Sequence, residues 1–497
     1  MALIQATNLT FTYDGSADAV FAELNFQIDS TWRLGLIGRN GRGKTTLLRL
    51  LAGQLMPQGR LLMPLAPALF PFPLPDAALS TREALMCFAP DTPPWRLLQE
   101  WNQLSLPETL LEQPFTTLSR GEQTKAQLAA LFAREDAYPL IDEPTNHLDL
   151  EGRAQVADYL AAKDGFLLVS HDRAFLNRCV DHTLSINRSS LSVQRGNFDT
   201  WEQEFNRKNE SEQARNDQLR RDVTRLTETA RRQAEWSRRC EQGKYHMAAS
   251  DSAVVDRGYI GARSAALMKR SQVAKARVEQ SIEEKRGLLH DVERVPTLKL
   301  TPLTNPKQVL VDVRDAAVRY GQRAVCADVR FTLERGERIA LTGPNGCGKS
   351  SVLKTLCGLS DALQGNVRIA SGLRISYVPQ STEGLCGDLR EWIARQGVDE
   401  TLFKTILRDM DFGRQQFDKT IEQYSDGQKK KLLLARSLCE QAHLYIWDEP
   451  LNYLDVFSRM QLESLLRNAQ PTLLLVEHDR AFLDAVCTRS ISLGAQT

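Results

Sequence analysis

The chain has 497 residues, of which 42% are hydrophobic and 25% are charged, and its 63 Lys and Arg nearly balance its 62 Asp and Glu. This length predicts two to four domains, and this composition is typical of a globular protein and excludes disorder as the main property of the chain. Nine cysteines without a C-x-x-C pair favour reduced thiols over disulfides, zinc or iron-sulfur sites.

The beginning of the chain and its most apolar stretch both argue against a secreted or membrane protein. The first residues, M-A-L-I-Q-A-T-N, lack the basic and apolar regions of a secretory signal. The most apolar stretch, 61–75, has 15 residues and five prolines, whereas a membrane-spanning helix needs about 20 apolar residues without such breaks. The sequence therefore predicts a cytoplasmic protein with no membrane part.

Four motifs recur in the same order at a spacing of 305 to 307 residues. The repeated pairs are G-R-N-G-R-G-K-T at 38–45 with G-P-N-G-C-G-K-S at 343–350, L-S-R-G-E-Q at 118–123 with Y-S-D-G-Q-K at 424–429, Y-P-L-I-D-E-P-T-N-H-L-D at 138–149 with L-Y-I-W-D-E-P-L-N-Y-L-D at 444–455, and S-H-D-R-A-F-L at 170–176 with E-H-D-R-A-F-L at 477–483. Shared order and spacing indicate a duplicated domain, and we place the two copies at 1–197 and 307–497.

Each copy has the pattern of an α/β domain. An apolar strand, a glycine-rich turn and a helix are predicted at 33–37 and 44–51, and again at 338–342 and 349–356. Short apolar runs bounded by polar turns predict further buried parallel strands at 138–141, 166–169, 444–447 and 472–476. Both copies are therefore expected to be doubly wound α/β domains.

Between the copies, 198–297 has a helical pattern that predicts an antiparallel helical hairpin. Thr200 and Gln203 have the spacing of a capping box, and apolar residues then recur every three or four positions. A first helix of ~40 residues would be about 60 Å long. Three glycines are expected to break the pattern near a tip at about 240–264, before a second helix that Pro296 ends. These glycines are Gly243, Gly258 and Gly261.

The glycine-rich turns match phosphate loops, whose backbone N–H groups surround phosphates at the positive end of the following helix. Lys44 and Lys349 are expected to contact the β- and γ-phosphates of a nucleotide. The hydroxyl groups of Thr45 and Ser350 are expected to bind Mg²⁺.

Carboxylate pairs follow a predicted strand in each copy, at the edge of the sheet where such folds bind ligands. Asp142 and Asp448 are expected to hold Mg²⁺, while Glu143 and Glu449 orient or deprotonate the attacking water. A histidine follows the next strand at a fixed distance from each pair, which favours a catalytic role in sensing the γ-phosphate. These histidines are His171 and His478.

Together, the motifs resemble those of ATP-binding-cassette (ABC) ATPases, in which an L-S-x-G signature accompanies the phosphate loop and the D-E pair. The resemblance covers both copies and implies, for each, a RecA-like parallel-sheet core with a helical subdomain. It also implies that ATP and Mg²⁺ bind in two sites between the cassettes of one chain. The expected ATP-binding residues are Tyr13, Gly38, Arg39, Asn40, Gly41, Arg42, Gly43, Lys44, Thr45, Thr46, Tyr320, Gly343, Pro344, Asn345, Gly346, Cys347, Gly348, Lys349, Ser350, Ser351 and Gln380, where the tyrosines match the aromatic residue that stacks on adenine.

The resemblance further implies that each signature closes over the nucleotide of the other cassette. Ser425, Gly427 and Gln428 would close over the nucleotide held by Lys44, and Ser119, Gly121 and Glu122 over the one held by Lys349. The second copy also matches the glutamine loop of the family, in which Gln380 helps to position Mg²⁺ and water. The first copy has L-F-P-F at 69–72 instead, and no glutamine occurs from 59 to 98. We therefore expect the two sites to hydrolyse ATP unequally.

Two cassettes joined by a helical hairpin resemble the ABC-F proteins, which act on the ribosome. The tip sequence G-Y-I-G-A-R-S-A-A-L-M-K-R-S at 258–271 and the P-F in place of P-Q resemble the antibiotic-resistance branch of the Lsa, Vga and Vml kind. This implies binding to the exit (E) site of the bacterial 70S ribosome and displacement of lincosamides, streptogramin A or pleuromutilins. A housekeeping ABC-F translation factor and the ATPase subunit of a transporter remain alternatives.

The charge distribution favours an RNA partner for the hairpin. Residues 231–277 hold 11 basic and 4 acidic residues, and 257–277 hold six basic residues and no acidic one. Such a patch is typical of phosphate binding, and aromatic side chains at the break would stack on unpaired bases. The resemblance implies 23S rRNA and the P-site tRNA as the RNA partners of a monomeric protein. The candidate contacts are Lys244, Tyr245, His246, Arg257, Tyr259, Arg263, Lys269 and Arg270.

Overall fold

The computed structural model describes residues 2–15, 19–74, 79–146, 148–186, 191–247, 298–321 and 323–494, with the backbone alone from 233 to 247. The chain divides into two compact units. Both cassettes lie in the first, Met1–Trp201 with Val295–Thr497, and Glu202–Arg294 form the second.

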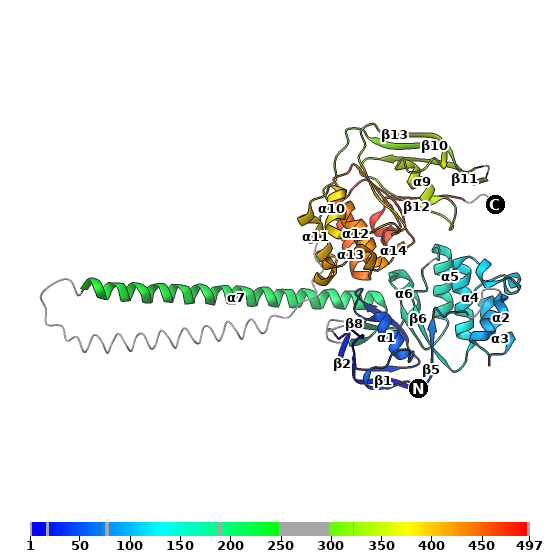
Figure 1. The fold of residues 1–497 in the computed structure, drawn as a ribbon, viewed down its shortest axis with the longest axis horizontal. Coiled ribbons are helices and arrows are strands. Elements are labelled where there is room, and N and C mark those ends of the chain that lie inside the picture. Colours follow the sequence, from blue (N-terminus) through cyan, green and yellow to red (C-terminus); the bar gives the residue numbers. More distant parts are fainter. Residues whose placement is uncertain are drawn as a thin grey trace. The chain divides into compact units, whose positions relative to one another are not determined.

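Each cassette is built around a mainly parallel sheet (Figure 1). In the first cassette the strand order is β5 (Ala66–Phe70), β6 (Ala137–Asp142), β7 (Phe166–Val169), β3 (Arg33–Gly38), β8 (His182–Ile186) and β9 (Leu191–Arg195). In the second it is β14 (Ile375–Val378), β15 (Leu444–Asp448), β16 (Leu473–Val476), β12 (Arg338–Thr342) and β17 (Arg489–Ser492). Only the pairing of β8 with β9 is antiparallel among these strand pairs. The predicted strands are confirmed, because apolar runs buried on both faces form the centre of each sheet.

A second, antiparallel sheet belongs to each cassette, and the sequence did not predict it. It contains β2 (Phe21–Asp29), β1 (Leu3–Phe11) and β4 (Gln58–Leu62) in the first cassette, and β11 (Arg323–Glu334), β10 (Val309–Tyr320) and β13 (Leu363–Ile369) in the second. Alternating buried and exposed residues, as along β2, give these strands one core-facing side. The antiparallel sheet packs over α1 (Lys44–Leu51) or α9 (Lys349–Leu356), the helices that follow the phosphate loops.

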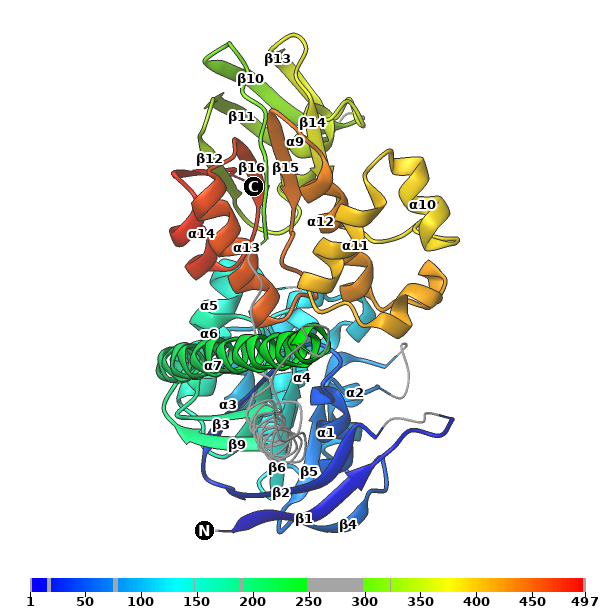
Figure 2. The ribbon, with the colours of Figure 1, turned by 90° about the vertical axis from the view of Figure 1, so that its left-hand side faces the viewer.

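Helices complete the two cassettes. The first contains α2 (Thr81–Phe88), α3 (Pro94–Gln103), α4 (Arg120–Ala133), α5 (Leu150–Ala161) and α6 (Arg173–Cys179), with short 3₁₀ turns η1 (Glu108–Glu112) and η2 (Phe115–Thr117). The second contains α10 (Leu389–Gln396), α11 (Glu400–Asp409), α12 (Asp426–Cys439), α13 (Val456–Ala469) and α14 (Arg480–Val486), with η3 (Arg414–Asp418) and η4 (Ile421–Gln423). Figure 2 shows α10 and α11 grouped beside α12. The helices α10, α11 and α12 form the helical subdomain that the resemblance implies for the second cassette.

The first linker helix, α7, extends over Phe198–Met247. Its 50 residues correspond to about 75 Å, so it is longer than predicted and Gly243 does not interrupt it. The predicted capping box at Thr200 is wrong. Thr200 lies inside the helix, and its backbone N and its hydroxyl donate to the side chain of Asn197, at 3.2 and 3.0 Å. Asn197 precedes the first helical residue and takes the capping role because its amide oxygen satisfies donors of the first turn.

The rest of the hairpin lies outside the described residues. This part includes the expected second helix and the glycines at 258 and 261. Within the described part of the chain, no helix combines the length and apolar character needed to span a bilayer.

Candidate functional site: two ATP sites

The two phosphate loops have the same backbone geometry. Gly43 and Gly348 precede the helices with φ of 89° and 94°, in the left-handed region. A Cβ on Gly43 would lie 2.7 Å from the Phe21 ring, and one on Gly348 would lie 3.0 Å from Val318. Backbone conformation and space therefore both require glycine here.

The loop lysines are buried and bind the loops from inside. Lys44 Nζ donates to the carbonyl oxygens of Gly38 (2.7 Å) and Arg39 (3.1 Å). Lys349 Nζ donates to those of Gly343 (2.8 Å) and Pro344 (2.9 Å). Burial lowers the pKa of Lys44, while the carboxylates around it oppose this shift. A phosphate group would add negative charge beside this buried ammonium group and favour its charged form.

The oxygen donors at the strand ends fit a Mg²⁺ ion. Thr45 Oγ1 donates to Asp142 Oδ2 at 2.9 Å, and Ser350 Oγ to Asp448 Oδ1 at 3.1 Å. Asp448 Oδ2 is buried and has no hydrogen-bond partner among the described residues. Burial raises the pKa of Asp142, and that of Asp448 to about 6. A carboxylate with an unsatisfied oxygen beside a hydroxyl group offers the oxygen donors that Mg²⁺ prefers, and the ion would neutralise charge on the phosphates.

The expected general bases have the same strained backbone. Glu143 and Glu449 follow β6 and β15 with φ of 52° and 47°, which is rare for residues other than glycine. Their backbone N–H groups donate to Val169 and Val476, each at 2.9 Å. Burial and the neighbouring Asp142 raise the pKa of Glu143 to about 7. A carboxylate with a pKa near neutrality is suited to accept a proton from water.

The histidines lie beside these glutamates. His171 Nε2 is 3.3 Å from Glu143 Oε1, and His478 Nε2 is 3.8 Å from Glu449 Oε1. Burial lowers the pKa of His171 well below its usual value and that of His478 to about 4. Both rings are therefore neutral at physiological pH, and each can donate one hydrogen bond. The structure thus brings base and histidine together in both cassettes.

The signature motifs begin helices α4 and α12 with capping boxes. Ser119 Oγ accepts from the backbone N of Glu122, and Ser425 Oγ from that of Gln428, each at 3.3 Å. The side chains of Glu122 and Gln428 bind back to their serines. These polar groups thus lie at positive helix ends, which suits an anionic ligand.

One signature lies against the phosphate loop of the other cassette. A Cβ on Gly427 would be 3.3 Å from Asn40 Nδ2 and 2.7 Å from the carbonyl oxygen of Tyr453. Asn40 Nδ2 itself donates to that carbonyl oxygen at 2.8 Å. The second signature and the first phosphate loop are therefore in direct contact.

The other composite site is a cavity of about 1140 Å³. It is lined by Ser119, Gly121 and Glu122 of the first cassette, and by Pro344, Asn345, Gly346, Gly348, Lys349, Ser350, Ser351, Gln380, Glu449 and His478 of the second. The predicted residues from the two cassettes thus surround one space, with Gln380 exposed on its wall.

The tyrosines lie beside the same helices. Tyr13 and Tyr320 are 39% and 58% exposed, and their hydroxyl groups lie 3.0 Å from Thr46 Oγ1 and 2.6 Å from Ser351 Oγ. Tyr320 also lines the composite cavity. Exposed rings at the phosphate loops are available for stacking, so adenine contact stays a prediction.

Among the other predicted loop residues, Cys347 is buried and Arg39 reaches the second cassette. Arg39 Nη1 lies 3.6 Å from Asp411 Oδ2, and its guanidinium carbon lies 5.1 Å from the centre of the Phe457 ring. The side chain of Arg39 therefore joins the two cassettes.

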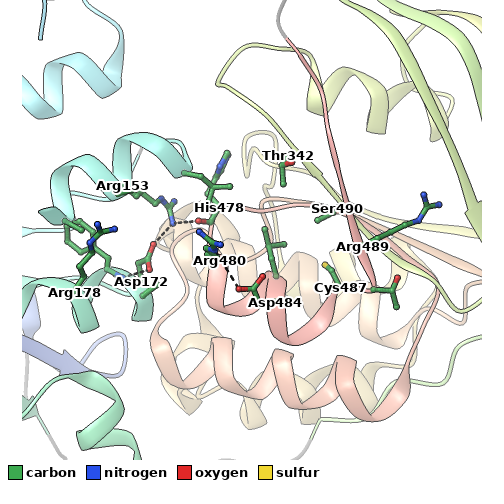
Figure 3. Close-up of a pocket in the computed structure, with 18 residues that line it drawn as sticks. Arg153, Asp172, Arg178, Thr342, His478, Arg480, Asp484, Cys487, Arg489 and Ser490 are labelled. Carbon is green, nitrogen blue, oxygen red and sulfur yellow. Dashed lines mark hydrogen bonds and ion pairs between the residues drawn. The ribbon is translucent and has the colours of Figure 1, made fainter. Parts of the chain in front are cut away.

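The sequence did not assign roles to Asp455 and Arg153, which join the cassettes. Asp455 Oδ2 accepts from the backbone N of Asn40 at 3.2 Å. Lys431 and Lys44 hold the pKa of Asp455 well below its usual value, against the effect of burial. Arg153 donates to Asp172 Oδ2 at 2.9 Å and to the carbonyl oxygen of His478 at 3.2 Å, as Figure 3 shows. The sequence did contain a signal for these residues. The repeat offset of 306 pairs Asp149 with Asp455 and Arg153 with Arg459.

A second cavity, of about 590 Å³, lies between α5 and α6 of the first cassette and α14 of the second. Figure 3 shows residues that line it. Its arginines are paired within the protein. Arg178 pairs with Asp158, Arg480 with Asp484, and Arg489 with Glu337.

The predicted RNA contacts are not placed by the structure. Lys244, Tyr245 and His246 lie in α7, where the backbone alone is described. Arg257, Tyr259, Arg263, Lys269 and Arg270 lie outside the described residues.

Comparison with known proteins agrees with this geometry. The family model described as ABC transporter matches residues 21–146 and 326–452, just over half of the chain. The chain therefore belongs to the ABC family and hydrolyses ATP. Its curated relatives place it, more narrowly, among the ABC-F ATP-binding proteins.

Two of the curated relatives match almost the whole chain, and a third matches about three quarters of it. ATP-binding protein Uup of Caulobacter vibrioides is 29% identical over 97% of this chain and 76% of its own length. Ribosome protection protein VmlR of Bacillus subtilis is 28% identical over 97% and 85%. Energy-dependent translational throttle protein EttA of Mycobacterium tuberculosis is 28% identical over 77% and 64%. Archaeal ribosome recycling factor aABCE1, solved with ribosomal stalk protein aP1, shares the fold with a TM-score of 0.64 at 19% identity, covering 98% of this chain and 89% of that one.

Proposed function

We propose that this chain is a cytoplasmic, ribosome-associated ABC-F ATPase that protects bacterial ribosomes from antibiotics. In its ATP-bound state the protein binds the E site of the 70S ribosome as a monomer. The linker reaches the P-site tRNA and the 23S rRNA of the peptidyl transferase centre. Lincosamides, streptogramin A or pleuromutilins are thereby displaced, and ATP hydrolysis releases the protein.

The observation that carries this proposal is the 28% identity to VmlR, named a ribosome protection protein, over 97% of this chain. Such coverage includes the linker as well as both cassettes. The basic residues of 231–277 provide the charge that an RNA partner would require.

The cassette contacts explain how nucleotide would control binding. Lys44 and Lys349 each bind phosphate in their own cassette. The signature of the other cassette approaches each of these sites. A γ-phosphate would therefore bridge the two halves and hold them closed. Glu143 and Glu449 accept the proton of the attacking water, and loss of the bridging charge lets the halves separate.

A second candidate is a general translation factor without drug specificity. EttA, named a translational throttle protein, and Uup match the chain at nearly the same identity as VmlR. Both candidates require ATP-dependent ribosome binding and differ in drug displacement.

The test is expression in a drug-sensitive bacterium, with inhibitory concentrations measured for lincomycin, tiamulin and virginiamycin M. We expect them to rise. Glu143→Gln combined with Glu449→Gln should trap the protein on ribosomes in ATP-dependent co-sedimentation. Unchanged susceptibility with intact ribosome binding would favour the general factor, and absence of ribosome binding would exclude both candidates.

A matched pair of charge variants separates the linker from the cassettes. Replacing Lys269 and Arg270 with alanine removes two linker charges and should abolish protection. Replacing Arg390 and Arg395 of α10 removes the same charge from a cassette surface and should leave protection intact. Equal loss in both variants would indicate a non-specific effect of charge.

A further inference from the structure

The second cassette contains a fully buried lysine whose role the motifs do not explain. Lys430 lies in α12 and has 0% exposure. Its Nζ donates to the carbonyl oxygens of Pro379 (2.9 Å), Asp448 (3.1 Å) and Gln380 (3.4 Å). An ammonium group has three donors, so all three are satisfied.

The three acceptors belong to the ends of two neighbouring strands. β14 and β15 are parallel, with Val378 opposite Trp447. Pro379 and Gln380 follow the first strand, and Asp448 ends the second. Lys430 therefore joins the glutamine loop to the strand end that carries the expected Mg²⁺ ligand.

Burying an ammonium group is costly unless it is hydrogen-bonded and has opposite charge nearby. Asp448, Glu477 and Glu449 provide that charge. α12 also binds the interior of β14, because Ser437 Oγ lies 2.8 Å from Ser376 Oγ and Arg436 donates to the carbonyl oxygen of Tyr377. These two contacts hold the strand, so Lys430 is not needed merely to attach it.

The first cassette has a different arrangement at this place. The offset of 306 pairs Lys430 with Thr124, which is partly exposed and donates to Arg120 of its own helix at 3.0 Å. The loop after β5 is held instead by Phe72, whose ring stacks on Phe88 with centroids 3.5 Å apart. Gln127 donates to the Phe72 carbonyl oxygen at 3.2 Å.

We infer that Lys430 is a positioning residue of the second ATP site: it fixes Gln380 relative to Asp448, so that both meet the same Mg²⁺ ion and attacking water. The first site has no such residue at the equivalent position. This role concerns ATP hydrolysis alone, and it does not depend on the proposed ribosome function.

The test uses the full chain with Lys430→Met, which keeps the length of the side chain and removes its donors. In a Glu143→Gln background, where turnover comes from the second site, kcat should fall by about tenfold or more. The Mg²⁺ concentration for half-maximal turnover should rise, while the KM for ATP changes less than kcat. In a Glu449→Gln background the same substitution should have little further effect. Thr124→Met is the matched control and should change neither quantity.

Hydrogen exchange of the nucleotide-free protein gives a readout that does not depend on turnover. Lys430→Met should speed amide exchange in 379–384, and Thr124→Met should not. Lys430→Gln keeps two donors without the charge and should give an intermediate effect on exchange. This variant replaces Lys430→Met in the test if the methionine variant folds poorly. Equal losses of kcat in both backgrounds, or unchanged exchange and Mg²⁺ dependence in the variants, would overturn the inference.

Discussion

The two cassettes have phosphate loops of the same geometry but hold the loop after the edge strand differently. Lys44 and Lys349 contact equivalent carbonyl oxygens, and Glu143 and Glu449 have nearly the same φ. The loop after β14 presents Gln380 and is tied by a buried ammonium group, whereas the loop after β5 is fixed by stacked rings. The two cassettes therefore share the geometry expected for phosphate binding and differ where the attacking water is expected.

The contacts between the cassettes are also unequal. On the side of the first phosphate loop, Asn40 and Arg39 contact the second cassette, and Arg173 pairs with Glu463. The offset of 306 pairs Glu463 with Ala157, which lines the cavity of Figure 3 together with Arg480. An ion pair on one side therefore corresponds to a cavity on the other.

The largest expected effect comes from the general bases. Glu143→Gln with Glu449→Gln should lower kcat by at least about a hundredfold, because neither amide accepts a proton from water. Among the single variants, Glu449→Gln should cause the larger loss of kcat, since the second ATP site contains Gln380 and the first has no equivalent glutamine. Steady-state ATPase assays measure this, with Glu391→Gln on the surface of α10 as the control. Matching rates for the two single variants would contradict the proposed inequality.

The two loops should respond oppositely to truncation. Phe72 is 6% exposed, so Phe72→Ala should lower the free energy of unfolding by about 3 kcal/mol through the lost stacking and the cavity left behind. Gln380 is exposed, so Gln380→Ala should leave stability nearly unchanged and lower ATP turnover. Urea unfolding and ATPase assays on both variants check this. Full stability in the phenylalanine variant would show that its ring does not hold the loop.

A smaller effect is expected at the one-sided ion pair. Glu463 and Arg173 have side chains 14% and 11% exposed, so Glu463→Ala should lower the free energy of unfolding by about 2 kcal/mol by removing the carboxylate that faces a shielded guanidinium group. Urea unfolding measures the change, and Arg178→Ala, which breaks a half-exposed pair, should have much less effect. A coupling energy near zero between Arg173 and Glu463 would contradict this asymmetry.

Local patterns predicted much of each cassette. The helix boundaries at 44–51 and 349–356 are confirmed because a glycine turn and an apolar run fix them locally. The helix start at Thr200 was wrong, because Asn197 competes as a cap three residues earlier. The antiparallel sheets were missed, since β4 and β13 join them over long separations, such as Val311 with Ile369, and the local strand pairs carry no motif.

The sequence by itself determined the duplication, the phosphate loops, the carboxylate pairs and the missing glutamine, because each depends on particular side chains at fixed spacing. The tertiary structure alone decided which groups meet across the fold. Asn40 and Asp455 are 415 residues apart, and the acceptors of Lys430 are backbone carbonyl oxygens. Since every residue has such an oxygen, no sequence pattern marks the acceptors of a buried lysine, and folding has to bring them to it.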